Sequence, residues 1–389
     1  MVARHSLIFL LFICNLSNVA GQMVMGKDTL VGNEWINYEQ QYFKFTVDRD
    51  GIYRIPQATL AAAGITAQAV GNQIRIYSMG QQVPLFVSTN GVFGPTDFIE
   101  FLGLKNRGEL DRHLFRHADE DMLNPWHSMY TDKRAYYLTF SGSDQPLRVT
   151  TIPNNTSNPP TPEASYIHEE ILEFNGANND PYFQTTSGAI SYSSYLHGEG
   201  FGKSSEPNST TEISAINKIP AQDAILHLRF ASTNISEHQY IVKWNNELLD
   251  TIFGEDIQIK DFQYTIPSDR IQNVNQLNIS NSNSLSRFSL VIVSLTYPRT
   301  TDAAGSTSMI LNLETKSTDQ YFNIEGFAHN GVQPLLYSTD GRYRMVTDMN
   351  GSSAVHFLWP VSTQATKLLL TDPTTSVGTI SSLEEKVFT

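Results

Sequence analysis

The sequence contains almost no cysteine and no cluster of basic side chains. Its 389 residues include one cysteine, Cys14, near the start of the chain. Disulfides, thiolate zinc sites and a cysteine nucleophile are therefore excluded from the residues after this leader region. Acidic residues outnumber basic ones, 39 against 26, so polyanions such as nucleic acid and anionic membrane surfaces are excluded as partners.

Long apolar runs are also missing, and the single short one lies in a segment typical of a cleavable export signal. A basic start precedes an apolar run at 7–13, and small residues at 19–21 offer a cleavage site. The run is too short to span a membrane. Cys14 leaves a lipoprotein reading open, although its neighbours are not the small residues that such a site needs. We expect residues 1–21 to be a signal peptide.

Short runs of β-branched and aromatic residues alternate with Gly, Asn, Asp and Pro turn signals roughly every ten residues. This pattern predicts an all-β protein with antiparallel β-sandwich or barrel domains in tandem. One short helix is expected, with Pro56 at its start and Gly64 as its C-terminal stop. The runs at 42–47 and 52–55, separated by a short turn, predict a β-hairpin.

Composition also divides the chain into domains. The segment 152–165 is polar and rich in proline, so it cannot continue a sheet and is expected to be a linker.

The run 288–295 is apolar on both faces and predicts a central strand that ends at Pro298. The expected parts are a signal peptide at 1–21, an N-terminal β domain at 22–151, the linker at 152–165, a β-sandwich domain at 166–350 and further strands at 351–389.

One group of potential metal ligands lies in the N-terminal half. It combines two histidines four residues apart with acidic residues and a third histidine: His113, His117, Asp119, Glu120, Asp121 and His127. Helical periodicity is absent around the group, and two arginines interleave with it. We therefore interpret it as an exposed polar loop and assign no metal site.

The pair His197-Gly198 has the order found in caspase-like peptidases, where the imidazole assists a cysteine. The required thiol is missing here. Glycines at every second position from 198 to 202 are typical of backbone with positive φ or of close packing. A tight structural turn is the favoured interpretation.

Other catalytic patterns are weak. The adjacent carboxylates Glu169-Glu170 and Glu384-Glu385 point to opposite faces of an extended chain, which makes each pair a poor acid/base couple. The sequence has no Gly-x-Ser-x-Gly elbow, phosphate loop or dinucleotide fingerprint. It therefore indicates no catalytic residue, no cofactor and no metal site.

Several strings, in order along the chain, carry a resemblance to a known family. They are WINY (35–38), DGIYRI (50–55), GVFGPTDFIEF (91–101), NRGELD (106–111), NPWHSMYTD (124–132), YYLT (136–139), GEGF (198–201) and LTYPR (295–299). They resemble the region before the catalytic domain of PorU-type proteins, which are gingipain-like cysteine peptidases of type IX secretion. The resemblance implies a cell-surface protein of a Gram-negative bacterium whose relatives cut the C-terminal sorting signal from exported cargo and pass the cargo to a lipopolysaccharide anchor.

The sequence departs from this family in one respect. In the family a peptidase domain with its His and Cys follows the β region, and this chain ends where that domain would begin. No catalytic residue is therefore transferred, and we expect the chain alone to be inactive. The resemblance implies a non-catalytic scaffold that packs against a peptidase domain of the same or a partner chain and against type IX secretion components at the outer membrane.

Two other functions remain open. A free-standing surface module would bind glycan or protein through an exposed aromatic platform formed by Trp35, Trp126, Tyr130 or Trp244. Clustered, exposed rings would favour this module, and buried rings would favour the scaffold. The third function is a hydrolase whose site is assembled from scattered Asp, Glu and His, which requires strongly shifted pKa values.

Overall fold

The computed structural model describes residues 33–65, 70–140, 142, 145–180, 195–283, 285–351 and 353–389, and the backbone of two short paired strands, β1 (Val24–Met25) and β2 (Asp28–Thr29). Most elements in these residues are strands, which confirms the all-β class. None of the helices in this part of the chain is long and apolar enough to cross a membrane. The expected signal peptide at 1–21 lies outside the described residues.

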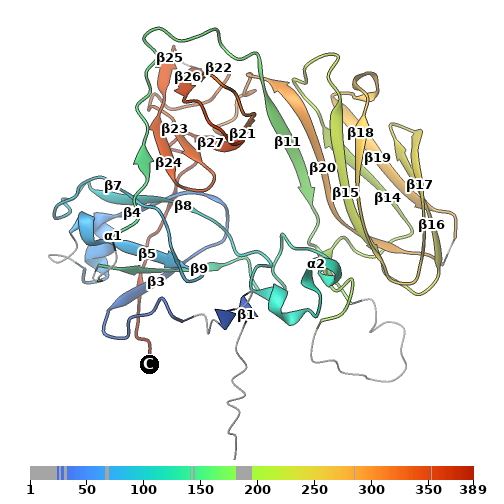
Figure 1. Cartoon of the computed structure of the whole chain (residues 1–389), viewed down its shortest axis with the longest axis horizontal. Coiled ribbons are helices and arrows are strands. Elements are labelled where there is room, and N and C mark those ends of the chain that lie inside the picture. Colours follow the sequence, from blue (N-terminus) through green and yellow to red (C-terminus); the bar gives the residue numbers. More distant parts are fainter. Residues whose placement is uncertain are drawn as a thin grey trace, which may run out of the picture.

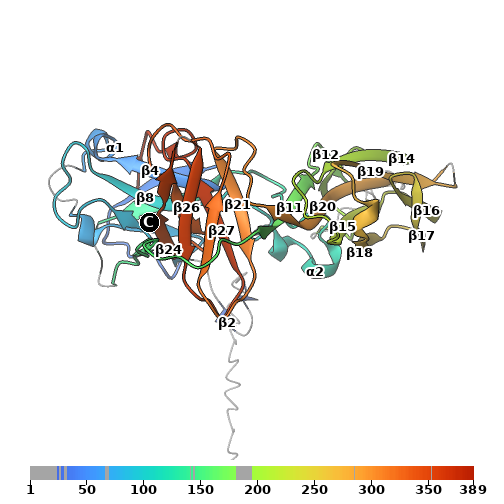
Figure 2. The same ribbon diagram turned by 90° about the horizontal axis from the view of Figure 1, so that it is seen from above.

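Figure 1 shows three β units: an N-terminal sandwich mostly in blue and teal, a middle sandwich from green through yellow to the orange β20, and a C-terminal sandwich in deeper orange and red. In Figure 2 the N-terminal and C-terminal sandwiches lie side by side, and the middle sandwich lies apart from them. Tandem β-sandwich units are therefore present, as predicted.

The N-terminal sandwich packs a sheet of order β28-β4-β8-β7 against a sheet of order β29-β3-β9-β5-β6. Phe45, Phe101 and Tyr136 meet in its core with ring centroids 5.4, 5.6 and 5.8 Å apart, a spacing typical of aromatic packing. Its strands are β3 (Tyr42–Val47), β4 (Gly51–Pro56), β5 (Arg75–Ser78), β6 (Gln81–Gln82), β7 (Phe86–Val87), β8 (Phe98–Gly103), β9 (Arg134–Thr139), β28 (Gly378–Thr379) and β29 (Glu384–Lys386).

The turn at 48–50 connects the two sheets of this sandwich. β3 pairs with β9 and β29, whereas β4 pairs with β8 and β28, so the predicted hairpin is wrong. Phe45 on β3 and Ile55 on β4 enter one core from opposite sides, which requires the two strands to lie in facing sheets. The local sequence predicts a turn here but does not determine which strands it joins.

The expected short helix is α1 (Gln57–Ala62), and it is confirmed. Pro56 is its N-cap in extended conformation, and Gly64 follows its C-terminus with φ +80°. This positive φ is the left-handed conformation in which glycine commonly terminates helices. The remaining helical elements are η1 (Gly71–Gln73), η2 (Asp111–Leu114), α2 (Ala118–Asp121) and η3 (Ser268–Arg270).

The middle sandwich packs a sheet of order β14-β19-β16-β17 against one end of a nine-stranded sheet, the strands β11-β20-β15-β18. Its core contains Trp244, Tyr240, Phe230 and Phe288, all fully buried. Its strands are β11 (Ser165–Glu173), β12 (Ala177–Asn179), β13 (Gly200–Gly202), β14 (Asn208–Ser214), β15 (Ala224–Ser232), β16 (Glu237–Trp244), β17 (Glu247–Glu255), β18 (Ile259–Ile266), β19 (Val274–Asn281) and β20 (Phe288–Thr300).

The expected central strand is β20, which lies between β11 and β15 and is confirmed. The predicted end of this strand at Pro298 is wrong. β20 continues to Thr300, and Pro298 sits opposite Ile167 of β11 with its carbonyl accepting a hydrogen bond from Ile219 N at 2.9 Å. Proline is tolerated here because its carbonyl still finds a donor.

The C-terminal sandwich uses the other end of the nine-stranded sheet, β10-β24-β23-β27-β21, and packs it against β22-β26-β25. The two ends of the sheet join through a single register pair, Ile167 of β11 with Asn312 of β21. Its strands are β10 (Thr150–Thr151), β21 (Ser308–Leu313), β22 (Gln320–Ile324), β23 (Leu335–Ser338), β24 (Tyr343–Val346), β25 (Asp348–Asn350), β26 (Ala354–Trp359) and β27 (Thr366–Thr371).

The strands expected at 166–350 thus contribute to two hydrophobic cores. The strands expected at 351–389 turn back onto the chain: β26 and β27 belong to the C-terminal sandwich, and β28 and β29 complete the N-terminal sandwich. Ile380, just after β28, is buried in the N-terminal core, and its amide donates to Arg54 O at 2.9 Å.

The segment expected as a linker runs along the C-terminal sandwich. Asn154 Nδ2 donates to Asp348 Oδ2 at 3.0 Å and to His356 O at 3.1 Å. Its Oδ1 accepts a hydrogen bond from Leu358 N at 2.9 Å. The polar side chain of Asn154 therefore forms hydrogen bonds with backbone and side-chain groups of β25 and β26. These bonds hold the segment in place.

Candidate functional site

A buried ionic cluster joins the N-terminal and C-terminal sandwiches. Glu100 on β8 is 0% exposed, and its Oε1 accepts hydrogen bonds from Arg344 Nε at 2.9 Å and from the Tyr337 hydroxyl at 2.5 Å. Its Oε2 accepts one from Arg54 Nε at 2.7 Å. Burial, followed by the nearby Glu100 charge, raises the pKa of Tyr337 well above its usual value. Both oxygens of the Glu100 carboxylate accept hydrogen bonds, so its buried charge is paired. The cluster therefore holds the two sandwiches together.

Apolar packing surrounds the Glu100 cluster. Ile52 and Leu102 of the N-terminal sandwich pack with Leu335 of the C-terminal sandwich. The Arg344 guanidinium carbon lies 4.1 Å from the ring centroid of Phe86, a cation–π distance. The interface between the two sandwiches, the first of two joints in the structure, therefore combines apolar contacts with a shielded ion pair.

A second joint attaches the segment between β8 and β9 to the middle sandwich. Arg229 on β15 is buried, and its guanidinium donates to Leu123 O at 2.9 Å, to Met122 O at 2.7 Å and to Asp261 Oδ2 at 2.5 Å. Asn124 Nδ2 donates to Phe201 O at 3.1 Å. These side-chain donors bind backbone carbonyls across the contact, so the segment is held against the middle sandwich.

His197 belongs to this second joint. Its Nδ1 lies 3.1 Å from Asp121 Oδ1, and its Nε2 lies 3.4 Å from the Ile259 amide nitrogen, which donates to it. This arrangement favours the neutral tautomer with the proton on Nδ1. Gly198 lies in the turn with φ 81°, and Gly200, the first residue of β13, has φ 146° and packs closely against Leu123. The turn expected at the His-Gly pair is therefore present.

The residues considered, and not assigned, as potential metal ligands have separate surroundings in the structure. His113 and His117 are exposed, Asp119 pairs with Arg112 at 2.5 Å, and Asp121 holds His197. His127 Nδ1 lies 3.2 Å from Asp132 Oδ1. Within the described ranges, no three or more His, Cys, Asp or Glu side chains come close enough together to hold a metal ion.

The carboxylate pairs also have separate partners. Glu169 pairs with Lys367 at 3.3 Å, and Glu170 lies 3.3 Å from His168 Nε2. Glu385 Oε1 accepts a hydrogen bond from Gln41 Nε2 at 2.6 Å. Burial raises the pKa of Glu199, whose carboxylate accepts a hydrogen bond from the Leu196 amide at 2.9 Å. These contacts are structural, and the structure brings none of these carboxylates together as an acid/base couple.

The four rings considered as an aromatic platform lie in different environments. Trp244 is 0% exposed and donates through Nε1 to Arg270 O at 2.9 Å. Trp35 packs against other rings, with Tyr77 stacked at 5.3 Å. Trp126 meets His227 edge to face at 6.3 Å. Tyr130 is 67% exposed, and its hydroxyl lies 2.7 Å from that of Tyr195. These rings form no common platform.

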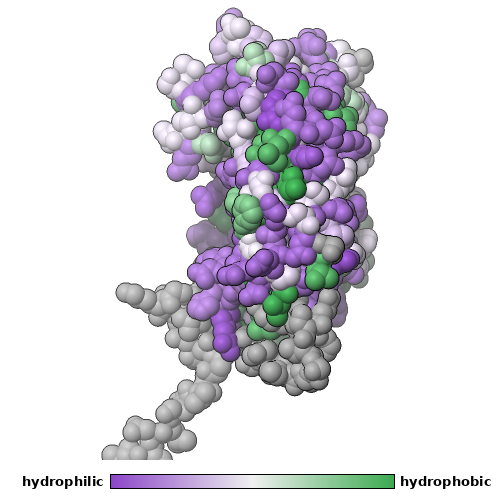
Figure 3. Space-filling model, turned by 90° about the vertical axis from the view of Figure 1, so that its right-hand side faces the viewer, coloured by the Kyte–Doolittle hydropathy of each residue, from purple (hydrophilic) through white to green (hydrophobic). Residues whose placement is uncertain are grey.

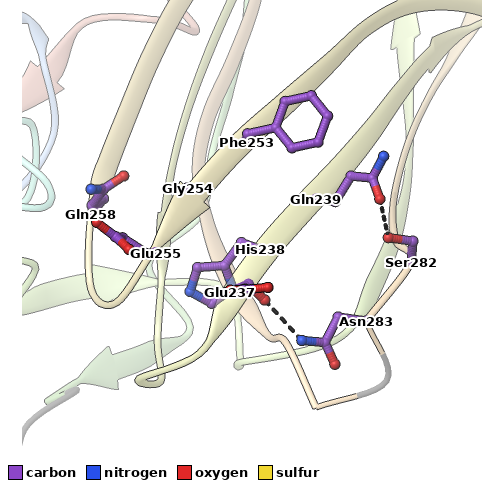
Figure 4. Close-up of a pocket in the computed structure, with 9 residues that line it drawn as sticks. All are labelled: Glu237, His238, Gln239, Phe253, Gly254, Glu255, Gln258, Ser282 and Asn283. Carbon is purple, nitrogen blue, oxygen red and sulfur yellow. Dashed lines mark hydrogen bonds between the residues drawn. The ribbon is translucent and has the colours of Figure 1, made fainter.

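A pocket of about 600 Å³ opens on the middle sandwich between β16 and β17 (Figure 4). Figure 3 faces this side of the molecule and shows a mostly hydrophilic surface with separate hydrophobic side chains. The residues that line the pocket are Glu237, His238, Gln239, Phe253, Gly254, Glu255, Gln258, Ser282 and Asn283.

Strand pairing positions the side chains of this pocket. Gln239 on β16 lies directly opposite Phe253 on β17, and Glu237 lies directly opposite Glu255. Both pairs occupy the same face, because residues two apart on a strand point to the same side. The inner face of the same sheet carries the buried residues Tyr240 and Ile252, which explains why the polar residues face outward.

His238 lies on the buried side of the pocket. It is buried, and its Nε2 lies 2.8 Å from Asp256 O, so Nε2 carries the proton. Its Nδ1 then accepts a hydrogen bond from the Ser286 hydroxyl. Both ring nitrogens are therefore satisfied within the protein, and His238 has a positioning role.

Sequence reasoning did not single out this pocket. The strand β17 was not predicted, although the two asparagines at 245 and 246, both with positive φ, form the turn that leads into it. Residues 251–255 read Thr-Ile-Phe-Gly-Glu and do not alternate in polarity, so the local signal for this strand is weak. Phe253 lies opposite Gln239 because of the register between β16 and β17. A bulge between Val242 and Lys243 shifts that register.

Comparisons with known proteins bear on the fold. No protein-family model and no curated protein matches the sequence. Among solved structures, dimeric latent PorU from Porphyromonas gingivalis matches with a TM-score of 0.56 and 11% identity over 87% of this chain and 32% of that chain. The resemblance to PorU is confirmed at the level of the fold, and this chain spans about a third of the length of the solved PorU chain.

Two further structures match weakly. The CBM36-1 domain of a xylanase from the hindgut metagenome of Trinervitermes trinervoides has a TM-score of 0.21 and 11% identity over 33% of this chain and 96% of that chain. A β-porphyranase of glycoside hydrolase family 86 from Bacteroides plebeius has a TM-score of 0.21 and 9% identity over 67% of this chain and 35% of that chain. Scores this low do not indicate a shared overall architecture.

Proposed function

We propose that this chain is the non-catalytic β scaffold of a gingipain-like sortase of the type IX secretion pathway. The observation that carries the proposal is the match to PorU over 87% of this chain. Cys14 is the only cysteine of the sequence, so a cysteine nucleophile has to come from another segment or another chain. In this proposal the peptidase acts on exported cargo, and the β units hold the peptidase in place.

The two joints suit a scaffold. Glu100 and Arg344 link the N-terminal and C-terminal sandwiches through a buried ion pair, and Arg229 ties the segment after β8 to the middle sandwich. Each joint uses hydrogen bonds that lose their partners if the units move apart, so a large relative motion is costly. A rigid body of this kind can present a peptidase domain and secretion partners at fixed positions.

In this proposal the protein is exported and lies on the outer side of the outer membrane. The export signal expected at 1–21 supports this location. Its partners are a peptidase domain of the same or another chain and components of the type IX secretion machinery.

A deletion experiment tests the proposal. Removing the codons for residues 33–389 in the source bacterium, with the rest of the locus intact, is expected to leave exported cargo with uncleaved C-terminal signals. Mass spectrometry of surface and medium fractions measures this. Normal cleavage of all cargo would contradict the proposal. Purified chain lacking residues 1–21 is expected to cleave no peptide that carries such a signal.

A further inference from the structure

We propose that the pocket between β16 and β17 binds a neutral saccharide rich in hydroxyl groups. The pocket combines one exposed aromatic ring with unpaired hydrogen-bonding groups of both kinds, which is the combination that sugar rings require. This inference does not depend on a role in type IX secretion.

The aromatic ring is that of Phe253. Its side chain is 68% exposed on β17, and Figure 4 shows it at one end of the lining residues, beside Gln239. Apart from the His238 imidazole, it is the aromatic ring among the residues that line the pocket. The negative face of an aromatic ring attracts the partly positive C–H groups on the apolar face of a sugar.

The hydrogen-bonding groups lie along the same strand pair and its neighbouring turns, and Gln239 is directly opposite Phe253. In the described part of the chain, the Glu237 and Glu255 carboxylates form no ion pair or side-chain hydrogen bond, so both are free acceptors. The Oε1 atoms of Gln239 and Gln258 accept hydrogen bonds from Ser282 at 2.6 Å and from Lys260 at 2.6 Å. These bonds orient both amides and leave their NH₂ groups as free donors. A sugar hydroxyl uses an acceptor and a donor at once.

The carboxylates also limit the class of ligand. Glu237 and Glu255 lie directly opposite each other across the strand pair, where like charges destabilise a sheet. An anionic sugar would add to this repulsion, whereas the hydroxyls of a neutral sugar donate to the carboxylates and relieve it. Two exposed carboxylates with an aromatic neighbour do not make a metal site, and the described residues contain no group that fits one.

The framework of the pocket is held in place before a ligand arrives. Its residues lie on paired strands, and His238 below them has both nitrogens satisfied. A Cβ at Gly254 would lie 3.0 Å from Gln258 Oε1 and 3.2 Å from Lys260 Cε, so the backbone here packs closely against the Gln258 turn. Little ordering of the backbone is therefore needed on binding.

Affinity electrophoresis of the full chain in native gels tests the proposal. The gels contain β-glucan, xylan or mannan as neutral probes, and polygalacturonate as an anionic probe. We expect slower migration in at least one neutral gel and none in polygalacturonate. Phe253→Ala is expected to weaken the retardation about ten-fold, the order of one lost aromatic contact.

Matched variants separate the pocket from the rest of the surface. Leu248→Ala removes another exposed apolar side chain from the same strand, outside the pocket, and is expected to bind as the wild type does. Glu255→Ala serves as a second pocket variant and is expected to bind more weakly, with thermal melts confirming that all variants fold.

Three results would overturn the proposal. They are no retardation in any neutral gel, unchanged binding by both pocket variants, and equal retardation in polygalacturonate. Binding of a lysine-rich peptide without any saccharide would instead assign the pocket to basic peptides. Cargo processing is not measured here, so this test and that of the scaffold role fail independently.

Discussion

Glu100 and Arg344 are 244 positions apart in the sequence, yet they form an ion pair at 2.9 Å with both side chains almost completely buried. The pair joins a strand of the N-terminal sandwich to a strand of the C-terminal sandwich. The relative position of these two units therefore depends on this buried ion pair together with the apolar contacts that surround it.

Replacing Glu100 with Gln tests this dependence. The change leaves the Arg344 guanidinium buried without an anion, and we expect the free energy of unfolding to fall by about 3–5 kcal/mol. Glu169→Gln is the matched control, because its pair with Lys367 is partly exposed and is expected to contribute about 0–1 kcal/mol. Urea unfolding followed by circular dichroism measures both. Equal effects of the two variants would contradict the prediction.

Arg229→Met is expected to release the segment around Met122 and Leu123 from the middle sandwich. The two backbone carbonyls lose their buried donors, so local opening becomes easier. Hydrogen exchange at the Leu123 amide, which donates to Glu199 O at 3.2 Å, should become faster by at least ten-fold. Arg112→Met changes an exposed arginine of the same segment and should leave this rate unchanged. A slow rate in both variants would show that other contacts hold the segment.

Ile380→Ala is expected to destabilise the N-terminal sandwich. Ile380 is buried in the core of that unit, and truncating such a side chain costs about 2–5 kcal/mol. Val387→Ala removes a side chain that is exposed and should have little effect. Thermal unfolding, with hydrogen exchange in β3 and β4 as the local readout, distinguishes the two. Unchanged exchange in these strands would mean that the last strands contribute little to the unit.

Stability should fall in alkaline solution. Burial raises the pKa of Tyr166, Tyr240 and Tyr297 to about 12 from an ordinary value of 10.0. Because the folded pKa exceeds the unfolded one, their contribution is complete below about pH 10 and is lost as the pH rises through about 12. We expect these three tyrosines to ionise as the protein unfolds. Their near-ultraviolet tyrosinate absorbance should therefore rise at the same pH at which the β-sheet circular dichroism signal is lost.

Tyr166→Phe provides the control for the alkaline transition. In the described part of the chain, the buried Tyr166 hydroxyl has no hydrogen-bond partner, so its removal costs little at neutral pH. The variant should unfold at a higher pH than the wild type. If the variant unfolds at the same pH as the wild type or at a lower one, Tyr166 does not contribute to the alkaline unfolding transition.

The strands were largely predictable from sequence, because their signal is local. Alternation at 42–47 and the doubly apolar run at 288–295 correspond to β3 and to part of β20. Strand partners were not predictable in the same way. The turn at 48–50 has the composition of a hairpin, yet it crosses between sheets, since the placement of Phe45 and Ile55 is decided by a core built from distant segments.

The candidate site was beyond the reach of sequence for the same reason. Gln239 and Phe253 become neighbours through strand register, and Ser282 joins them from the end of a third strand. Trp244 was one of the rings considered for an exposed aromatic platform, but it is fully buried in the core of the middle sandwich. Aromatic composition shows that large side chains are available but not which of them face solvent.

The return of β28 and β29 to the N-terminal sandwich has a consequence for synthesis. Of the three units described, the N-terminal sandwich begins first and is completed last, because β28 and β29 follow the C-terminal sandwich in the sequence. Until they arrive, the edges of β3 and β4 expose unpaired backbone groups. A nascent chain therefore carries an incomplete N-terminal sandwich, with exposed strand edges, until β28 and β29 have been synthesised.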